Sequence, residues 1–378
     1  MKAILIDDEK PALLHMERLL AAEHGVRVEG KFTSAQAGIE YLERSGADVV
    51  FLDIEMPGMN GLEAAERILQ IDDDIRIVYV TAYADYAVEA FERCAMDYLL
   101  KPIHPDRIAK TVRRIEAMLR KSSQGKEKAV NTEKRVCCLK RLALYDGDEA
   151  VRHLKWRTSK SQELFAFLLH RRDRWVSKDL ILDTLWPDTL RDKAMTHLHT
   201  SVYQIRKLLK QWGVQRTIEY ELDSYRLRAD EFQTDVQLLE AIPLEEPINE
   251  DSWEKLNRIT DMYSGDYLEE HDYVWAASKS KELLSRYLSL SLALARYEMQ
   301  TGRERMALQR LLLLQEKEPY SEEICELVLS AYARNSDYQA LQRHYDSFVE
   351  LFQADLGRKP DRPNDEQVSR LIQSGRQE

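Results

Sequence analysis

The sequence predicts a multidomain protein: an α/β domain with a parallel five-stranded sheet, a small mixed domain with three helices, and an all-α domain. Over residues 1–121, short apolar runs alternate five times with helical stretches, a pattern typical of βαβ units. A polar stretch at 122–134 separates this region from a basic segment at 135–230. Over 231–378, β-branched residues thin out and long helical periods take over. The length of 378 residues suits two or three domains.

The first domain is organised around a strand that ends on an acid. Four consecutive apolar residues predict a strand buried on both faces, and this strand ends on Asp53. Two other predicted strands run into Asp7-Asp8 and into Thr81, and a fourth is followed by Lys101. Because ligands of open α/β sheets bind outside the carboxyl ends of the strands, we expect these side chains to converge at one edge of the sheet. Helices are expected at about 11–24, 34–44, 61–70, 83–94 and 105–121.

Three carboxylates, a hydroxyl and a lysine at one sheet edge predict phosphoryl transfer. Carboxylates a few Å apart repel one another unless a hard cation lies among them, and Mg²⁺ takes oxygen ligands. With the metal in place, an ionised Asp53 can attack a phosphoryl donor. Lys101 would stabilise the charge of the phosphoryl oxygens, and Thr81 would donate its hydroxyl to one of them. A Thr81 drawn toward the phosphoryl group would leave space into which Tyr98 turns.

Residues 1–121 resemble the receiver domain of two-component response regulators, which has a flavodoxin-like fold. The resemblance rests on Asp7-Asp8, Asp53 with Met56-Pro57-Gly58, Gly61, Thr81-Ala82, and Tyr98 three residues before Lys101-Pro102. It implies that Asp8 and Asp53 ligate Mg²⁺ together with the backbone carbonyl of Glu55, and that Asp7 acts largely through water. It also implies a cis Lys101-Pro102 peptide and a histidine kinase that phosphorylates Asp53. The alternative is that these acids are ordinary strand-end residues of a flavodoxin-like fold.

The second domain differs from the rest of the chain in charge. From Lys134 to Arg216 the sequence contains 18 lysines and arginines against 9 acidic residues, a net charge of +9. The whole chain carries a net charge of −11, so the remainder carries −20. A basic module between two acidic ones indicates a polyanionic partner.

The third predicted helix of this domain, at about 192–211, suits a DNA major groove. Its buried face is formed by Leu198, Val202, Ile205 and Leu209, which step by four, three and four residues. An amide can pair with a base edge, hydroxyls can contact purines or pyrimidines, and cations hold phosphates. Such side chains occupy the opposite surface and the flanks, which hold Lys193, His197, Thr200, Ser201, Gln204, Arg206, Lys207 and Lys210.

Residues 136–229 resemble the OmpR-type winged helix in the variety found in SARP-like activators. The resemblance rests on Leu198-His199-Thr200-Ser201-Val202, on Ile205-Arg206-Lys207, and on a predicted hairpin after this helix as the wing. It implies binding of double-stranded DNA, with Tyr225 of the wing among the contacts. The wing departs from the family because Ser224 replaces the usual glycine and because Glu219, Glu221 and Asp223 make it acidic. The alternative is a winged helix that binds protein.

The third domain contains an internal repeat. Ala307-Leu308-Gln309-Arg310 recurs 33 residues later as Ala340-Leu341-Gln342-Arg343. Helix pairs with a period near 34 are typical of tetratricopeptide arrays. Behind a winged helix, this region resembles the bacterial transcriptional activator domain of the SARP-like family, which implies protein contacts between subunits or with RNA polymerase. The alternative is a bundle that only stabilises the winged helix. Helices are expected at about 253–263, 275–299, 303–316, 322–334 and 337–353.

Composition indicates a cytoplasmic protein that does not enter a membrane. No apolar run is long enough to span a bilayer, and the N-terminus enters a predicted strand without a secretory signal. The cysteines lack metal-ligand spacing and are expected to be reduced thiols. They are Cys94, Cys137, Cys138 and Cys325.

The sequence therefore predicts a response regulator in which phosphorylation of Asp53 controls DNA binding and transcription. The surface near Tyr98 would repack and release or pair the basic module, with a homodimer as the phosphorylated form. We expect no enzymatic purpose beyond self-phosphorylation and self-dephosphorylation, since no second catalytic constellation follows residue 121. The alternative is a phosphorylation-switched scaffold that acts through the helical repeats, and the salt dependence of DNA binding distinguishes the two.

Overall fold

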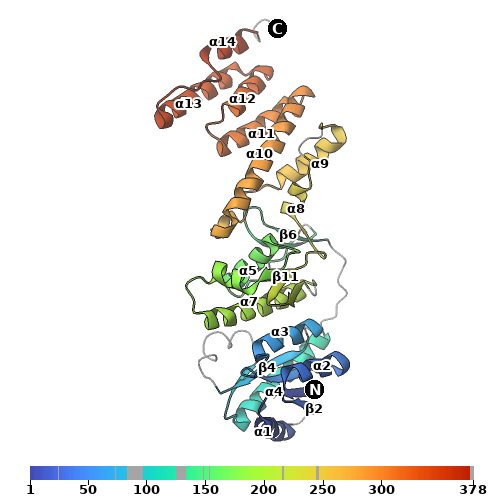
Figure 1. Cartoon of the computed structure of the whole chain (residues 1–378). Coiled ribbons are helices and arrows are strands. Elements are labelled where there is room, and N and C mark those ends of the chain that lie inside the picture. The colour runs from blue at the N-terminus through green and yellow to red at the C-terminus, as the bar shows by residue number, and fades with distance from the viewer. Residues whose placement is uncertain are drawn as a thin grey trace. The chain divides into compact units, whose positions relative to one another are not determined.

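The computed structural model describes residues 1–23, 25–72, 74–82, 97–124, 133–147, 149–152, 154–214, 217–243 and 247–374. The chain divides into two compact units (Figure 1). The first unit comprises Met1–Lys134 and Asp146–Phe232, and the second comprises Arg135–Tyr145 and Gln233–Glu378. Residues 135–145, which we expected at the start of the winged-helix domain, thus belong to the helical unit.

The N-terminal part of the first unit is a parallel sheet with strand order β2-β1-β3-β4-β5, which confirms the predicted flavodoxin-like fold. Its strands are β1 (Lys2–Ile6), β2 (Arg27–Phe32), β3 (Val49–Asp53), β4 (Arg76–Thr81) and β5 (Asp97–Leu100). Its helices are α1 (Lys10–Ala21), α2 (Ala35–Ser45), α3 (Gly61–Ile71) and α4 (Pro105–Gln124). The helix expected at 83–94 lies outside the described residues.

Strand β3 joins two hydrophobic cores because successive side chains of a strand point to opposite faces of the sheet. Val50 and Leu52 pack into a cluster with residues of α2 and α3. Val49 and Phe51 pack into a second cluster with residues of α1 and α4. All five residues of β3 are buried, so the strand carries Asp53 into the edge of the sheet on a rigid support.

The remainder of the first unit is a winged helix-turn-helix, as predicted. Its helices are α5 (Ser159–His170), α6 (Lys178–Leu185) and α7 (Arg191–Gln211), and its strands are β8 (Glu149–Ala150), β9 (Val176–Ser177), β10 (Ile218–Glu221) and β11 (Ser224–Leu227). The hairpin β10-β11 is the wing, and β9 pairs with β11 on its other side. The buried stripe predicted for α7 is confirmed, because Leu198, Val202, Ile205 and Leu209 are all fully buried.

The second unit begins with strands that pair across a long sequence separation. Strand β12 (Gln233–Thr234) lies parallel to β6 (Lys134–Cys137), and β7 (Ala143–Asp146) lies on the other side of β6. Asp235 follows β12, and its buried carboxylate accepts hydrogen bonds from the backbone amides of Cys138 and Leu139, each at 2.9 Å. This pairing explains why residues 135–145 belong to the helical unit.

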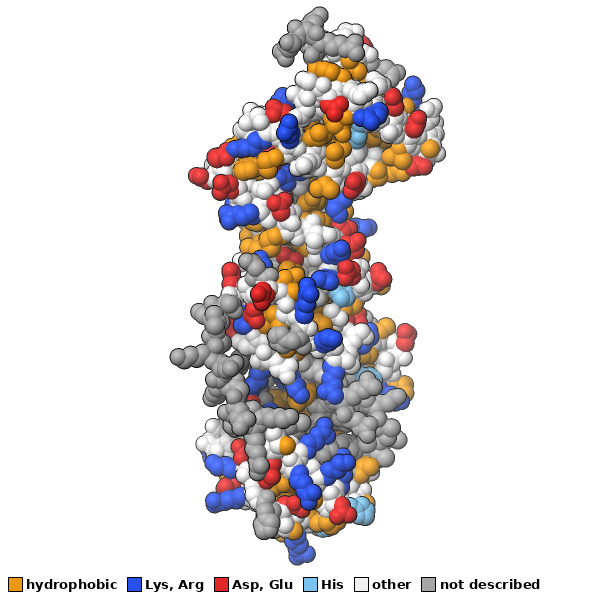
Figure 2. All heavy atoms as spheres, turned by 180° about the vertical axis from the view of Figure 1, so that it is seen from behind, with side chains coloured by type: hydrophobic (Ala, Val, Ile, Leu, Met, Phe, Trp, Pro, Cys, Tyr) orange, Lys and Arg blue, Asp and Glu red, His pale blue; other side chains and the backbone are white. Residues whose placement is uncertain are grey.

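The helical part of the second unit confirms the predicted repeat architecture, since α10, α11, α12 and α13 each pack against the next. The 3₁₀ helices are η2 (Glu269–His271) and η3 (Val274–Ala276). The α-helices are α8 (Asp235–Glu240), α9 (Glu250–Asp261), α10 (Ala277–Gln300), α11 (Glu304–Lys317), α12 (Glu322–Arg334), α13 (Tyr338–Leu356) and α14 (Asp365–Ser374). Acidic and basic side chains are interspersed over the visible face of these helices (Figure 2). No helix among the described residues is long and apolar enough to cross a membrane.

A buried ion pair links α10 and α11. The Glu298 side chain is fully buried and lies 2.8 Å from the Arg310 guanidinium, and the Trp253 indole donates to it at 3.1 Å. Arg310 also donates to Thr260 at 3.1 Å. The pair therefore joins α9, α10 and α11 through one carboxylate.

We expect Arg310→Met to lower the free energy of unfolding of the second unit by about 3–5 kcal/mol, because it leaves the Glu298 carboxylate buried without its cation. Arg343→Met is the matched control, since Arg343 occupies the same place in the repeated tetrapeptide but is exposed. Urea unfolding followed by circular dichroism measures both. Equal unfolding midpoints for the two variants would contradict the prediction.

Candidate functional site

The predicted acidic cluster forms at the carboxyl ends of β1 and β3. Side-chain oxygens of Asp7, Asp8 and Asp53 all lie within 4.8 Å of one another. Asp7 and Asp53 are buried, whereas Asp8 is exposed. The structure thus brings together the three carboxylates that the sequence placed at one sheet edge.

Lys101 joins this cluster from the end of β5. Its ammonium lies 2.7 Å from Oδ2 of Asp7 and 2.8 Å from Oδ2 of Asp53. Its backbone amide donates to the carbonyl of Thr81 at 2.8 Å, which fixes Lys101 beside the buried end of β4. The Lys101-Pro102 peptide is cis, as the resemblance implied. The predicted switch residue Tyr98 belongs to β5, but its side chain lies outside the described residues.

The electrostatics of the cluster depend on the balance between burial and ion pairing. Burial raises the pKa of Asp53, and the hydrogen bond from Lys101 opposes this rise without cancelling it. Burial lowers the pKa of Lys101, but hydrogen bonds to Asp53 and Asp7 raise it, so the net shift is upward. Lys101 therefore remains a cation next to the position where a phosphoryl group on Asp53 would carry negative charge.

The donor set fits a hard divalent cation. Its oxygens come from three carboxylates, and the one ammonium among them offsets only part of their charge. Oxygen donors of this kind suit Mg²⁺ better than a soft transition metal. The role of the Glu55 carbonyl as a further ligand stays a prediction.

Helix α3 begins in direct contact with the backbone of the predicted phosphoacceptor. The backbone amide of Gly61 donates to the carbonyl of Ile54 at 2.8 Å. The side-chain oxygen of Asn60 caps the helix by accepting a hydrogen bond from the backbone amide of Glu63 at 2.8 Å. A Cβ atom on Gly61 would lie 2.0 Å from the backbone oxygen of Asp53. Glycine is therefore required here by close approach, and α3 has no free space in which to shift independently of Asp53.

The predicted DNA-contacting residues of α7 fall into two groups. Lys193 and Lys207 are exposed, and His197 and Thr200 are partly exposed, with His197 stacked on Trp186. Ser201 and Gln204 are buried, so the prediction that they face solvent is wrong in this conformation. For Gln204 the reason lies within the winged helix, since the hydroxyl of Thr158 at the start of α5 donates to its side-chain oxygen at 3.3 Å.

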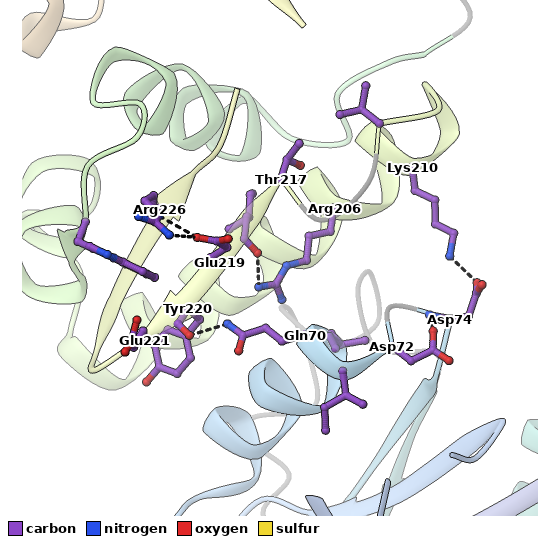
Figure 3. Close-up of a pocket in the computed structure, with 15 residues that line it drawn as sticks. Gln70, Asp72, Asp74, Arg206, Lys210, Thr217, Glu219, Tyr220, Glu221 and Arg226 are labelled. Atoms are coloured by element: carbon purple, nitrogen blue, oxygen red, sulfur yellow. Dashed lines mark hydrogen bonds and ion pairs between the residues drawn. The ribbon is translucent and has the colours of Figure 1, made fainter. Parts of the chain in front are cut away.

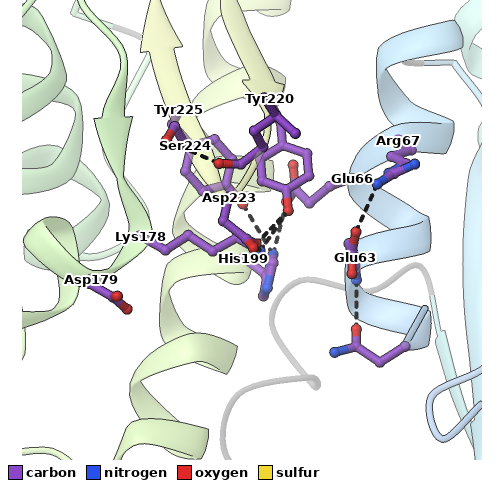
Figure 4. Close-up of polar contacts among 12 residues, drawn as sticks. Glu63, Glu66, Arg67, Lys178, Asp179, His199, Tyr220, Asp223, Ser224 and Tyr225 are labelled. Carbon is purple, nitrogen blue, oxygen red and sulfur yellow. Dashed lines mark hydrogen bonds and ion pairs between the residues drawn. The ribbon is translucent and has the colours of Figure 1, made fainter. Parts of the chain in front are cut away.

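Tyr225 of the wing is also buried, so its side chain is not accessible to DNA in this conformation, and its contact with DNA stays a prediction. Its hydroxyl lies 3.2 Å from Nδ1 of His199, a buried residue of α7 (Figure 4). The same ring nitrogen lies 3.3 Å from Oε1 of Glu66 in α3. The tyrosine therefore belongs to a polar cluster that includes a residue of the α/β domain.

Glu66 was not among the predicted site residues. It is 3% exposed and lies between two basic side chains. Oε2 of Glu66 lies 2.7 Å from the Arg206 guanidinium, opposite its contact with His199. Burial raises the pKa of Glu66, but Arg206 and His199 lower it further, so it falls below its ordinary value. The available signal was its position four residues after Leu62, which places a carboxylate on the apolar stripe of α3.

Arg206 and Lys210, predicted to hold DNA phosphates, are both ion-paired to the α/β domain. Lys210 lies 2.5 Å from Asp74, which follows α3 (Figure 3). Arg206 pairs with Glu66. Arg206 also donates to the carbonyl of Ile218 in the wing at 3.0 Å. Both cations are thus engaged by acidic residues in this conformation.

Two regions of the chain match models of known domain families. Residues 3–113 match the family model of the response regulator receiver domain, and residues 232–366 match that of the bacterial transcriptional activator domain. The chain thus combines a region that matches a receiver domain with a region that matches a bacterial transcriptional activator domain.

Its curated relatives are similar to the receiver domain. An uncharacterized response regulatory protein of Yersinia pestis is 44% identical over 115 residues, which are 30% of this chain and 48% of that protein. The transcriptional regulatory protein BtsR of Escherichia coli K12 is 38% identical over 117 residues, which are 30% of this chain and 48% of BtsR. The chain spans about half the length of these relatives.

Among solved structures, Mycobacterium tuberculosis EmbR, in complex with a low-affinity phosphopeptide, is similar over 65% of each chain. The TM-score is 0.51 and the sequence identity is 19%, so the similarity concerns the fold. It supports the multidomain architecture described above.

We expect Gly61→Ala to destabilise the receiver domain by about 1–3 kcal/mol and to slow its phosphorylation, because the added methyl displaces the backbone of Asp53. Gly58→Asn is the matched control in the same loop. Gly58 has a φ of 86°, which asparagine tolerates, and its added Cβ meets no atom within 4 Å. Calorimetry and the rate of phosphorylation by acetyl phosphate measure both effects. An unchanged melting temperature for Gly61→Ala would refute the close-approach argument.

Proposed function

We propose that the chain is a two-component response regulator in which phosphorylation of Asp53 by a histidine kinase controls sequence-specific DNA binding and transcription. The observation that carries the proposal is the contact of Lys101 with both Asp53 and Asp7 at the edge of the receiver sheet. The bacterial transcriptional activator domain supports an output in transcription. The proposed location is the cytoplasm, where a kinase and DNA are both accessible.

The proposed chemistry is transfer of a phosphoryl group from a phosphohistidine. A carboxylate oxygen of Asp53 forms a bond to phosphorus, the phosphorus–nitrogen bond breaks, and the imidazole nitrogen leaves with the electron pair. Lys101 would stabilise the charge on the phosphoryl oxygens, and Thr81 would donate its hydroxyl to one of them. Mg²⁺, held by Asp7, Asp8, Asp53 and the Glu55 carbonyl, would neutralise charge between donor and acceptor. We propose no enzymatic activity beyond self-phosphorylation and self-dephosphorylation.

The proposed DNA partner is supported by charge. The winged helix lies within the basic part of the sequence, and α7 presents Lys193 and Lys207 to solvent. Exposed cations on such a helix suit the phosphates of double-stranded DNA. The helical repeats are proposed to contact RNA polymerase or the second subunit of a phosphorylated homodimer.

One observation favours a second candidate function, a phosphorylation-switched scaffold that acts through the helical repeats. Ser201 and Gln204, the short polar residues predicted to contact bases, are buried. A winged helix that never exposes them has no means of direct base readout through these side chains. DNA binding decides between the two functions.

Asp53→Asn is expected to abolish phosphorylation, because an amide cannot attack phosphorus as a carboxylate does. Glu17→Gln is the matched control, since Glu17 is an acid of α1 that pairs with Lys31 at 2.6 Å away from the cluster. Phosphate-affinity electrophoresis after incubation with acetyl phosphate and Mg²⁺ measures the phosphorylated fraction. A phosphorylated band that persists in Asp53→Asn would refute the assignment.

Binding to a pool of genomic DNA fragments, at two salt concentrations and with or without acetyl phosphate, tests the output. We expect selective enrichment that grows with phosphorylation. The logarithm of the affinity should fall with the logarithm of salt by a slope of about −0.9 per phosphate contacted. Equal enrichment with and without acetyl phosphate would show that phosphorylation of Asp53 does not control DNA binding. No enrichment under any condition would favour the scaffold.

A further inference from the structure

The acidic side of α3 contacts the predicted DNA-contacting side of α7. Glu66 is the centre of this contact. One of its oxygens lies 2.7 Å from Arg206, and the other lies 3.3 Å from His199 (Figure 4). An ionised, buried carboxylate is stable only where cations and hydrogen-bond donors compensate its desolvation. The charge of α3 is therefore complementary to that of α7 at Glu66, the buried carboxylate whose desolvation costs most.

Two further polar contacts extend this match. The Lys210 ammonium meets Asp74 at 2.5 Å, and the Gln70 amide donates to the backbone carbonyl of Tyr220 in the wing at 2.6 Å (Figure 3). The receiver thus contacts both elements of a winged helix that usually face DNA, the third helix and the wing.

The contact is built so that it can open. A cavity of about 870 Å³ lies beside these contacts, and its lining includes Asp72, Arg206, Lys210 and Glu219. A cavity of this size with charged side chains in its lining has room for water, so the polar contacts here border an aqueous space. Such a contact can exchange with an aqueous or polyanionic partner at a modest cost.

Competition with DNA follows from the identity of the cations. Arg206 and Lys210 are two of the four cations that the sequence assigns to DNA phosphates. In this conformation carboxylates of Glu66 and Asp74 occupy the positions that phosphates would need. DNA and α3 therefore cannot bind these two side chains at the same time.

The same helix is connected directly to the phosphoacceptor. Helix α3 begins at Gly61, which touches the backbone oxygen of Asp53. The loop between Asp53 and α3 also faces the first turns of α7 across a second cavity of about 450 Å³. That cavity is lined by Glu55, Met56 and Pro57 from the loop and by Asp192, Met195 and Thr196 from α7.

We propose that the α3 face formed by Glu66, Gln70 and Asp74 is an intramolecular competitor of DNA, which holds α7 and the wing until phosphorylation of Asp53 shifts α3. This inference rests on the proposed function, since it assigns the regulation of the DNA-binding surface. A displacement at Asp53 would reach Glu66, Gln70 and Asp74 through Gly61 and helix α3, which is a single rigid element. It does not require the side chain of Tyr98.

The test uses the full chain with receiver substitutions, which leave every predicted DNA contact intact. Glu66→Gln combined with Asp74→Asn removes both competing charges, and Asp74→Asn alone is a surface change that cannot unfold the core. Glu63→Gln is the matched control, because Glu63 lies on the same helix but pairs with Arg67 within α3 at 3.0 Å. DNA affinity without a phosphoryl donor is measured by fluorescence anisotropy, and hydrogen exchange of α3 and the wing is measured in parallel.

We expect the double variant to bind DNA roughly 5- to 150-fold more tightly than the unphosphorylated wild type, the range of ordinary coupling free energies. Asp74→Asn should give a smaller gain, and Glu63→Gln none. Exchange of α3 and wing amides should rise in the double variant. Wild-type affinity in the double variant, together with tighter binding by the phosphorylated wild type, would overturn the competition.

The two measurements separate the inference from the function on which it rests. If no form of the chain binds DNA, the proposed DNA-binding function fails. Faster exchange in the double variant would then still support the contact between α3 and the winged helix. Unchanged exchange in the double variant would overturn that contact.

Discussion

The ammonium of Lys101 between two buried carboxylates is the interaction on which the receiver depends. It joins Asp7 after β1, Asp53 at the end of β3 and Lys101 after β5, three strands that lie far apart in sequence. Removing these charges from water is costly, and each is stable only because the others are present. The cluster therefore both holds the sheet edge together and keeps charged groups where phosphoryl transfer needs them.

The same principle operates twice more in the described structure. Glu66 is buried against Arg206 and His199 in the first unit, and Glu298 is buried against Arg310 in the second. Each carboxylate fixes the relative position of the helices that it joins, which are α3 and α7 for Glu66 and α9, α10 and α11 for Glu298. Apolar contacts alone would define these positions less specifically. The difference lies in the surroundings, since Glu298 is enclosed among helices, whereas Glu66 lies near a cavity with charged walls.

Local patterns were sufficient to predict most elements. Helix α12 (Glu322–Arg334) has the predicted bounds, because its apolar period and its cap agree. The short helix α8 was missed, since six residues give too little period to recognise. The boundary at 135–145 was wrong for another reason. It depends on the pairing of β6 with β12, across nearly 100 residues of sequence, which no local pattern encodes.

The phosphoryl-transfer cluster was predictable because the carboxyl ends of parallel strands lie at one edge of the sheet, whatever the conformation of the loops between them. The burial of Gln204, Ser201 and Tyr225 was not predictable in this way. A helical period identifies the apolar stripe of α7, but it says nothing of what packs on the polar side, which is Thr158 of the same domain for Gln204 and α3 for His199 and Arg206. The carboxylate that contacts this side belongs to α3, more than 130 residues earlier, and its sequence signal was one acid on an apolar stripe.

The pairing of β6 with β12 has a consequence for the modularity of the chain. Val136 and Thr234 are register partners on adjacent strands, and the segment between β7 and β12 contains the whole winged helix. The module is therefore an insertion that leaves one small sheet after β7 and returns to it at β12, two strands that flank β6. Recombination at these two points can exchange or excise the winged helix while both ends of the cut remain close enough for a short turn to join them.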